Sequence, residues 1–170
     1  MINASGLYTE EVAKRIEDIS LPKIKTVMYA KGHYYLYKKK NPFKHLIYPL
    51  PNSNGHGIHA GMDIENNLRF GPNAKWVESI EYSFDENTLD EFCNSIRSYW
   101  INFDPSCLTP DYTGIRSKIV AEGEGGQDFE ILDASDHGLE NLIHLQGIDS
   151  PGLTSSLSIA GEVISKLGIH

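Results

Sequence analysis

Two histidines and an aspartate form the first group whose residue types could do chemistry. His56 and His59 lie three residues apart, and Asp63 follows shortly after them. Imidazole and carboxylate groups are common metal ligands, but residues i and i+3 of a strand point to opposite faces. The sequence also lacks an HExxH motif and a cysteine cluster. Three interpretations stay open: a metal site, one catalytic or substrate-side histidine, or loop histidines without a chemical role.

Arg116 is the second candidate, at the end of the segment Tyr112–Arg116. A guanidinium on an otherwise apolar strand needs a partner, because burying it unpaired is costly. Its planar fork suits a carboxylate, which it can bind through two parallel hydrogen bonds. The partner is either a bound ligand or one of the 23 acidic side chains of the chain itself.

A third pattern, Gly147–Ser155, is rich in small residues and precedes the last predicted helix. Such a segment lets a ligand approach the free N–H groups of a helix start, where the helix dipole favours partial negative charge. Ordinary capping of the helix by Thr154 is the alternative.

The absence of certain motifs and the acidic composition argue against nucleotide-binding, serine-hydrolase and nucleic-acid-binding functions within these residues. The sequence contains no GxGxxG, no Walker motif and no GxSxG elbow, and the glycine-rich segment 122–126 is acidic and would repel phosphate. With 15 Lys+Arg against 23 Asp+Glu, the formal charge is −8, which disfavours a nucleic-acid or anionic membrane surface. The basic run 38–40 is too short to change this.

The length of 170 residues fits one domain, or one domain and a fragment, with a real core, since domains commonly have about 100–200 residues. Cys93 and Cys107 lie outside any CxxC pair and are expected to be reduced thiols. No apolar run approaches the ~20 residues needed to cross a bilayer, and the N-terminus has no secretory h-region. We expect a cytoplasmic protein, with a peripheral membrane association as the alternative.

Short strands and a few helices must position these candidates. Thr9 is expected to cap a first helix, preceded by the end of a buried strand at Met1-Ile2. Strands are predicted over 26–29, 34–37, 46–49, 56–62 and 67–70, where β-branched and aromatic residues gather. Short connections favour antiparallel pairing.

The strongest helix signal covers residues 86–100, with Asp85 as its cap and Phe92 on its apolar face. Strands near 112–119, 129–132 and 142–145 follow, with a flexible tip at 123–126. A last helix is predicted over 154–167, ending at Gly168, and its expected core face is Leu157, Ala160, Ile164 and Leu167. The expected fold is α+β, with a mixed, mainly antiparallel sheet and helices on one side.

Eight stretches cover nearly the whole chain: NASGLYTEEVAKRI (3–16), KGHYYLY (31–37), HLIYPLP (45–51), GIHAGMD (57–63), RFGPNAKWV (69–77), PDYTGIRSKI (110–119), DFEILDASDHG (128–138) and LIHLQGIDSPGLTSSLSIA (142–160). In this order they resemble the C-terminal half of FAD-dependent oxidoreductases of the D-amino-acid-oxidase superfamily. Within it, the sequence is most similar to L-2-hydroxyglutarate dehydrogenases and oxidases.

The resemblance implies a division of the chain. In this superfamily the FAD domain is split, and its dinucleotide fingerprint lies in the N-terminal half, which these 170 residues do not include. Residues 1–22 would be a remnant of the FAD-binding domain, 23–149 the substrate-binding domain, and 150–170 the C-terminal loop and helix of the FAD domain. The missing N-terminal FAD-binding half is therefore an expected partner.

The resemblance also assigns residues to the cofactor. The turn of Asn3, Ala4, Ser5 and Gly6 matches the one beside the dinucleotide, and Lys31 and Gly32 precede the strand that covers the flavin. The loop and helix start of Ser150, Pro151, Gly152, Leu153, Thr154 and Ser155 match the backbone that faces the flavin C2 carbonyl.

Two residues carry the implied chemistry, and no metal is implied. Arg116 matches the position near the substrate carboxylate, and His59 is the candidate for orienting or deprotonating the substrate hydroxyl. The sequence departs from the pattern at Ser117, where relatives usually have proline, and at Gly61, where they often have threonine. The first departure would loosen the strand of Arg116, and the second leaves the polarity of the pocket open.

The implied reaction is oxidation of a small 2-hydroxy acid, L-2-hydroxyglutarate, to 2-oxoglutarate, with hydride transfer to FAD. Glycine-like amines and glycerol phosphate are alternative substrates. A different class of function is also open, in which the chain is an inactive fragment or the partner half of a split flavoprotein. By itself the chain is expected to bind FAD weakly or not at all, and to self-associate through exposed apolar surface.

Overall fold

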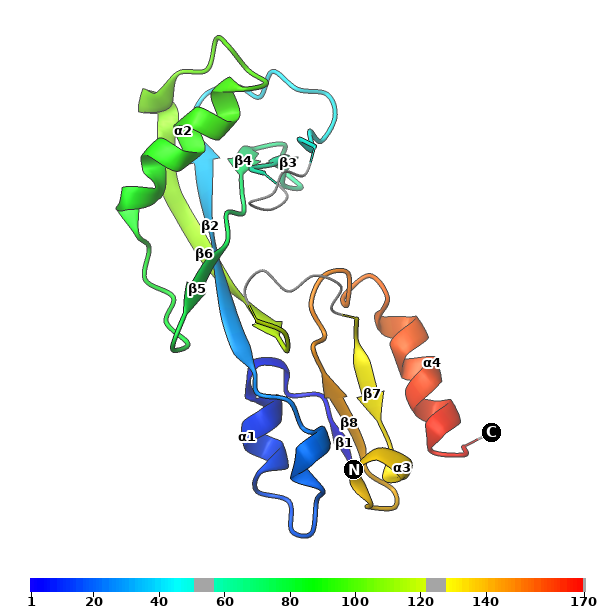
Figure 1. The fold of residues 1–170 in the computed structure, drawn as a ribbon. Coiled ribbons are helices and arrows are strands. Elements are labelled where there is room, and N and C mark those ends of the chain that lie inside the picture. Colours follow the sequence, from blue (N-terminus) through cyan, green and yellow to red (C-terminus); the bar gives the residue numbers. More distant parts are fainter. Residues whose placement is uncertain (51–56, 122–127, 170) are drawn as a thin grey trace. The chain divides into compact units, whose positions relative to one another are not determined.

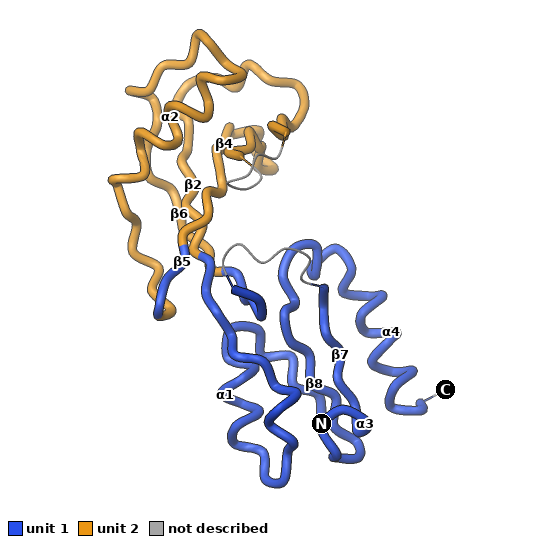
Figure 2. The backbone as a smooth tube through the Cα atoms, in the orientation of Figure 1, with its two compact units in different colours: residues 1–30, 76–78, 116–170 blue, residues 31–75, 79–115 orange. Residues whose placement is uncertain are grey.

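The computed structural model describes residues 1–50, 57–121 and 128–169. Figure 1 shows the helices and strands, and Figure 2 shows two compact units. The first unit comprises residues 1–30, 76–78 and 116–170, and the second comprises 31–75 and 79–115. The helices and strands are, in order, β1 (Ile2–Asn3), α1 (Thr9–Ala13), β2 (Met28–Tyr37), β3 (Ala60–Met62), β4 (Leu68–Phe70), β5 (Lys75–Val77), α2 (Leu89–Arg97), β6 (Leu108–Lys118), β7 (Glu130–Leu132), α3 (Ala134–His137), β8 (Ile143–Gln146) and α4 (Ser156–Lys166).

The first unit contains a three-stranded sheet in the order β1-β8-β7. β1 runs parallel to β8, with Ile2 opposite Ile143, and β7 runs antiparallel to it. A strand at the N-terminus was expected from the sequence, and it is present. Its parallel pairing with a segment near the other end of the chain makes this sheet mixed.

Alternation along β8 separates an apolar face from a polar one. Ile143 and Leu145 pack with Val163 of α4, which runs alongside the sheet in Figure 1. The intervening His144 and Gln146 are also buried. They bond to Asn3 and to the backbone of Lys23, which belong to the N-terminal segment.

Of the four residues predicted on the core face of α4, only Leu167 packs on the sheet within the described residues, and the rest of the packing face is different. Leu157 is 87% exposed and Ile164 48% exposed, whereas Ile159, Val163 and Leu167 contact the sheet. The helix carries two apolar stripes, and its periodicity alone does not show which one packs. Gly168 follows with φ of 66°, as expected for a C-terminal stop.

Thr9 is also used differently from the prediction. It is the first residue of α1, and the capping position falls on Tyr8. The Thr9 hydroxyl instead donates to the backbone carbonyl of Leu145, at 2.7 Å. The Thr9 side chain therefore links α1 to β8 and does not cap the helix.

The second sheet has the order β3-β4-β2-β5, with β6 also paired to β2. The segments predicted over 26–29 and 34–37 form one continuous strand, β2. β3 and β4 are an antiparallel hairpin whose turn contains Asn66 at φ of 64°. The predicted strand 46–49 is reduced to one bridge between Ile47 and Ala60.

The core of the second unit is built on α2, as its periodicity predicts. Phe92, Cys93 and Ile96 are buried against residues of β2 and β4. The Asp85 carboxylate accepts from the Asn87 N–H at the start of the preceding 3-10 turn, so its capping role is confirmed. The helix ends at Arg97, and Trp100 still packs on the core from the segment that follows.

Two short elements escape the sequence-based prediction. β5 has only three residues, and α3 has four, held by a capping box of Asp133 and Asp136 and closed by Gly138 in the left-handed region. The predicted tip at 123–126 lies outside the described residues. The α+β class with mixed, mainly antiparallel strands is confirmed, and the strands are divided between two sheets.

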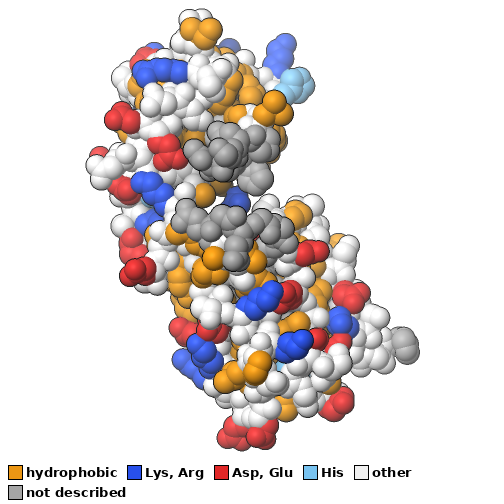
Figure 3. All heavy atoms as spheres, viewed as in Figure 1, with side chains coloured by type: hydrophobic (Ala, Val, Ile, Leu, Met, Phe, Trp, Pro, Cys, Tyr) orange, Lys and Arg blue, Asp and Glu red, His pale blue; other side chains and the backbone are white. Residues whose placement is uncertain are grey.

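Charged side chains of both signs lie on the surface of the described residues. In Figure 3, Lys and Arg side chains are interspersed with Asp and Glu on the visible face. Within the described ranges, no helix is both long and apolar enough to span a bilayer.

Candidate functional site

The C-terminal end of β6 brings two cations to one carboxylate. Arg116 and Lys118 are two residues apart on a strand and so share a face. Lys118 Nζ lies 2.7 Å from Asp149 Oδ2, and Arg116 Nε lies 3.8 Å from Asp149 Oδ1. The Asp149 side chain is only 11% exposed, and that of Arg116 is 37% exposed. Arg116 is therefore held near an acid without a close hydrogen bond to it.

The turn at residues 3–6 lies beside this strand end. The buried Asn3 side chain donates to the Thr9 carbonyl and contacts His144 Nδ1, each at 2.9 Å. It also accepts from the Ser5 hydroxyl. The Ser117 hydroxyl lies 3.5 Å from the Gly6 carbonyl, so the departure at Ser117 places a polar contact between β6 and the turn.

A pocket of about 150 Å³ opens next to the turn. It is lined by Ala4, Gly6, Leu145, Gln146, Gly147 and Ile148. Ligand sites commonly have roughly 300–1,000 Å³, so this pocket is too small to enclose a dinucleotide. It can hold part of a ligand whose remainder is bound elsewhere.

The loop that leads into α4 offers unpaired backbone donors. Within the described part of the chain, no acceptor is recorded for the N–H groups of Leu153 and Thr154. A Cβ at Gly152 would lie 2.6 Å from the Asp149 carbonyl oxygen, so the loop has no room for a side chain there. The N-cap is Ser155 rather than Thr154, and it makes no side-chain cap bond.

These donors fit the group that the resemblance implies. Unpaired N–H groups before a helix favour partial negative charge, and the C2 carbonyl region of a flavin carries such charge when reduced. The turn 3–6, Arg116 and the loop 147–155 thus gather in the first unit. Their assignment to FAD remains a prediction.

Sequence reasoning did not identify Asp149 or Lys118. Both lie within stretches that were recognised, but their contact joins two distant segments of the chain. The only local signal was an acidic residue immediately before Ser150 in a loop otherwise made of small and apolar residues.

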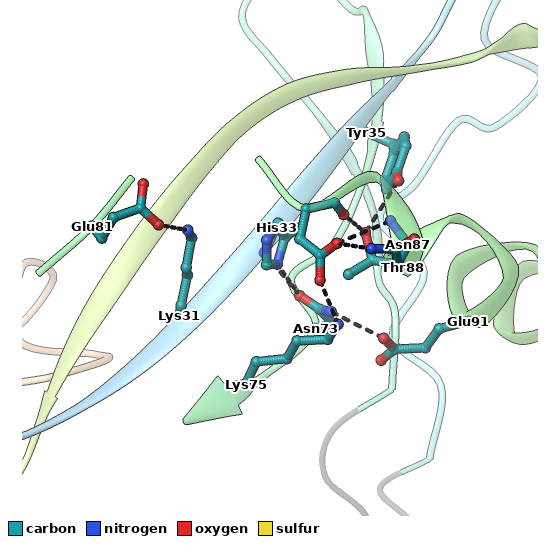
Figure 4. A network of polar contacts seen from close by, with 10 residues as sticks. Lys31, His33, Tyr35, Asn73, Lys75, Glu81, Asn87, Thr88 and Glu91 are labelled. Atoms are coloured by element: carbon teal, nitrogen blue, oxygen red, sulfur yellow. Dashed lines mark hydrogen bonds and ion pairs between the residues drawn. The ribbon is translucent and has the colours of Figure 1, made fainter. Parts of the chain in front are cut away.

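Lys31 and Gly32 belong to the second unit. The Lys31 side chain is only 6% exposed, and its ammonium lies 3.0 Å from the Glu81 carboxylate, as Figure 4 shows. A Cβ at Gly32 would lie 2.7 Å from Pro72 Cβ. Close packing therefore explains the glycine, and the predicted contact of both residues with the cofactor is untested.

A separate polar network lies further along β2, around His33 and Asn73 (Figure 4). The Asn73 side chain accepts from the His33 backbone N–H and contacts its Nδ1, and it donates to Glu91. Burial lowers the pKa of His33, and the Asn73 hydrogen bond opposes this shift. Burial thus favours the neutral form of His33, whereas the hydrogen bonds of the network hold β2 to the following segment and to α2.

His59 lies in the second unit, half-buried, with its ring 4.3 Å from that of Tyr48 in an edge-to-face arrangement. Asp63 pairs with Arg69 at 2.7 Å, and hydrogen bonds from Asn67 lower its pKa. His56 lies outside the described residues. Elsewhere in the described ranges, no three His, Cys, Asp or Glu side chains gather as a metal site would require.

Comparison with known proteins gives a consistent family. The FAD dependent oxidoreductase family matches residues 1–167. The chain is 33% identical to the mitochondrial L-2-hydroxyglutarate dehydrogenase of Arabidopsis thaliana, over 98% of this chain and 37% of that protein. It is 29% identical to the glycerol 3-phosphate oxidase of Mycoplasma genitalium, over 99% of this chain and 42% of that protein.

A solved structure shares the fold. The dithionite-reduced, FAD-bound L-alpha-glycerophosphate oxidase of Mycoplasma pneumoniae superimposes with a TM-score of 0.76 at 18% identity. The match covers 99% of this chain and 42% of that one. The chain thus spans less than half the length of each of these proteins, and with a family match over nearly all its residues it belongs to the FAD-dependent oxidoreductases.

Proposed function

We propose that the chain supplies the substrate-binding part of a flavoenzyme that oxidises L-2-hydroxyglutarate to 2-oxoglutarate. The observation that carries this proposal is the position of Arg116, a half-exposed guanidinium held beside the loop 147–155 without a close hydrogen bond to Asp149. A free guanidinium fork suits a carboxylate of the substrate. The similarity to the Arabidopsis dehydrogenase supports this choice of hydroxy acid.

Each residue then has a stated task. Arg116 binds a substrate carboxylate and fixes the orientation of the carbon that bears the hydroxyl. For His59, which lies in the second unit, we propose from the resemblance alone that it orients the substrate hydroxyl or takes its proton as a general base. FAD, when bound, supplies the hydride acceptor.

The cofactor would be shared with a second part of the enzyme. The turn 3–6 and the loop 150–155 would contact the flavin, and a separate FAD-binding half would hold the pyrophosphate and adenosine. In this proposal residues 1–22 and 150–170 belong to the flavin domain and 23–149 to the substrate domain. The small volume of the pocket beside Gly6, about 150 Å³, supports such sharing.

A chimera tests the proposal. These 170 residues replace the matching segment of the Arabidopsis dehydrogenase, and reduction of a dye is measured with L-2-hydroxyglutarate and with glycerol 3-phosphate. Turnover of L-2-hydroxyglutarate that depends on His59 and Arg116 is expected. A yellow, FAD-loaded chimera that oxidises neither compound contradicts the proposal.

Glycerol 3-phosphate is the second candidate substrate, because relatives that act on it match almost the whole chain. A chimera that prefers glycerol 3-phosphate would select this function instead. The segments grafted from this chain then carry the preference, since the Arabidopsis parent serves as the matched control.

A further inference from the structure

One carboxylate in the first unit is shared unequally between two cations. Lys118 Nζ lies at 2.7 Å from Asp149 Oδ2, which is the length of a charge-assisted hydrogen bond. Arg116 Nε lies at 3.8 Å from Asp149 Oδ1, which is beyond hydrogen-bond length. Among the described residues, no other acidic side chain is recorded within ion-pair distance of either cation.

Asp149 thus pairs more closely with the lysine than with the arginine, which is the reverse of the usual preference of a carboxylate. Guanidinium groups bind carboxylates through two parallel hydrogen bonds, whereas an ammonium acts as a compact point charge. Asp149 is nearly buried and needs a cation, so in the absence of Lys118 the adjacent guanidinium is the available partner. Closing of Asp149 onto Arg116 would occupy the fork that the proposed function requires.

We infer that Lys118 is a positioning residue that keeps Arg116 open for an anionic ligand by holding Asp149 away from it. This inference rests on the proposed function for the nature of the ligand, a small carboxylate. Two cations and one carboxylate leave a single positive charge at the strand end. That charge matches one carboxylate group of the ligand.

The first test needs no ligand. Nitrogen-15 NMR of the Arg116 Nε–Hε group is recorded for the wild-type chain, for Lys118→Met and for Lys118→Met/Asp149→Asn. In Lys118→Met, we expect the Hε resonance to move downfield and its exchange with water to slow, because Asp149 closes onto Arg116. In the double variant both changes should disappear. Unchanged Arg116 signals in a folded Lys118→Met chain overturn the inference.

A matched control uses a similar ion pair in the same unit. Lys166 lies 2.7 Å from Asp133, with side-chain exposures of 27% and 24%. Lys166→Met therefore removes a comparable pair and should leave the Arg116 signals unchanged. Lys118→Gln provides a second variant if Lys118→Met does not fold, with the same expected shift.

The second test measures anion binding by titrating the chain with L-2-hydroxyglutarate and following the Arg116 signal. Binding to Lys118→Met should weaken about tenfold or more, as expected for losing hydrogen bonds to a charged group. The double variant should regain wild-type affinity.

If the double variant stays weak, Lys118 itself contacts the ligand and the inference is wrong. If the wild-type chain does not bind the probe, the proposed role of Arg116 fails, while the ligand-free spectra still decide the role of Lys118.

Discussion

At the scale of single residues, the two interpretations of Arg116 turn out to be compatible. The sequence left open a bound carboxylate or an internal acid as its partner. The structure supplies an internal acid, Asp149, at a distance that leaves the guanidinium half-exposed. An ion pair of this length and exposure contributes little to stability, so it does not remove Arg116 from the site.

Arg116→Lys in the chimera separates these roles. The substitution keeps the charge but loses the fork geometry, and the loss of a charge-assisted bond of ~1.5–3 kcal/mol lowers kcat/KM roughly 10- to 100-fold. We expect the melting temperature to change little. An unchanged kcat/KM with a lower melting temperature would instead assign Arg116 a structural role.

Buried histidines give the chain a pH-dependent stability. Burial lowers the pKa of both His33 and His144. The unfolded chain therefore binds more protons than the folded one just below the unfolded pKa of about 6.5, and stability falls as the pH drops through that range. The urea midpoint should decrease between about pH 7.5 and pH 5.5. His33→Gln, which cannot titrate, should flatten this dependence, while the exposed His45→Gln should not.

At the scale of elements, prediction succeeded where one apolar face was clearly dominant. α2 has a single stripe, and the burial of Phe92, Cys93 and Ile96 was predicted correctly, as was Asp85 as the cap of the turn that leads into the helix. α4 has two stripes, so its packing face depends on where β7 and β8 lie, which local periodicity does not contain. The three residues of β5 are too few for a periodic signal.

In the candidate site, too, local features could be predicted and contacts between distant segments could not. The turn 3–6, Arg116 and the loop 150–155 could be proposed from local sequence and resemblance. The contact of Lys118 with Asp149 could not, because it joins segments that only the fold brings together. His59 and Arg116 were predicted together as catalytic residues from the resemblance alone, and they lie in different units.

Gly32 provides a test of packing within β2. An added methyl would meet Pro72 Cβ at 2.7 Å and the Asn73 carbonyl at 3.1 Å, and overpacking of this kind costs ~1–3 kcal/mol. Gly32→Ala should lower the free energy of unfolding by that amount. Gly114→Ala is the matched control, because nothing lies within 4 Å of its added Cβ. Equal stability of the two variants would contradict the packing explanation.

At the scale of the whole molecule, the chain matches a flavoprotein family but covers less than half of its relatives. It contains no GxGxxG fingerprint, and the pocket beside Gly6 is small. The strongest attraction that we propose between these residues and FAD is that of one helix N-terminus, worth at most ~2 kcal/mol. Micromolar binding needs ~8 kcal/mol. Calorimetric titration of the 170-residue chain should therefore give no sub-micromolar FAD affinity, whereas the chimera should retain the cofactor.

The apolar stripe of α4 that does not face the sheet leads to a prediction about assembly. Leu157 is 87% exposed, Leu153 just before the helix is 92% exposed, and Ile164 is 48% exposed. Exposed apolar patches of neighbouring residues tend to find partners, so the isolated chain should associate with itself as its concentration rises.

Sedimentation velocity should show a shift to larger species that Leu157→Glu reduces. Ile101→Glu is the control, because Ile101 is equally exposed, at 89%, and lies outside this stripe. A strict monomer at high concentration would show that the stripe does not drive association of the chain with itself.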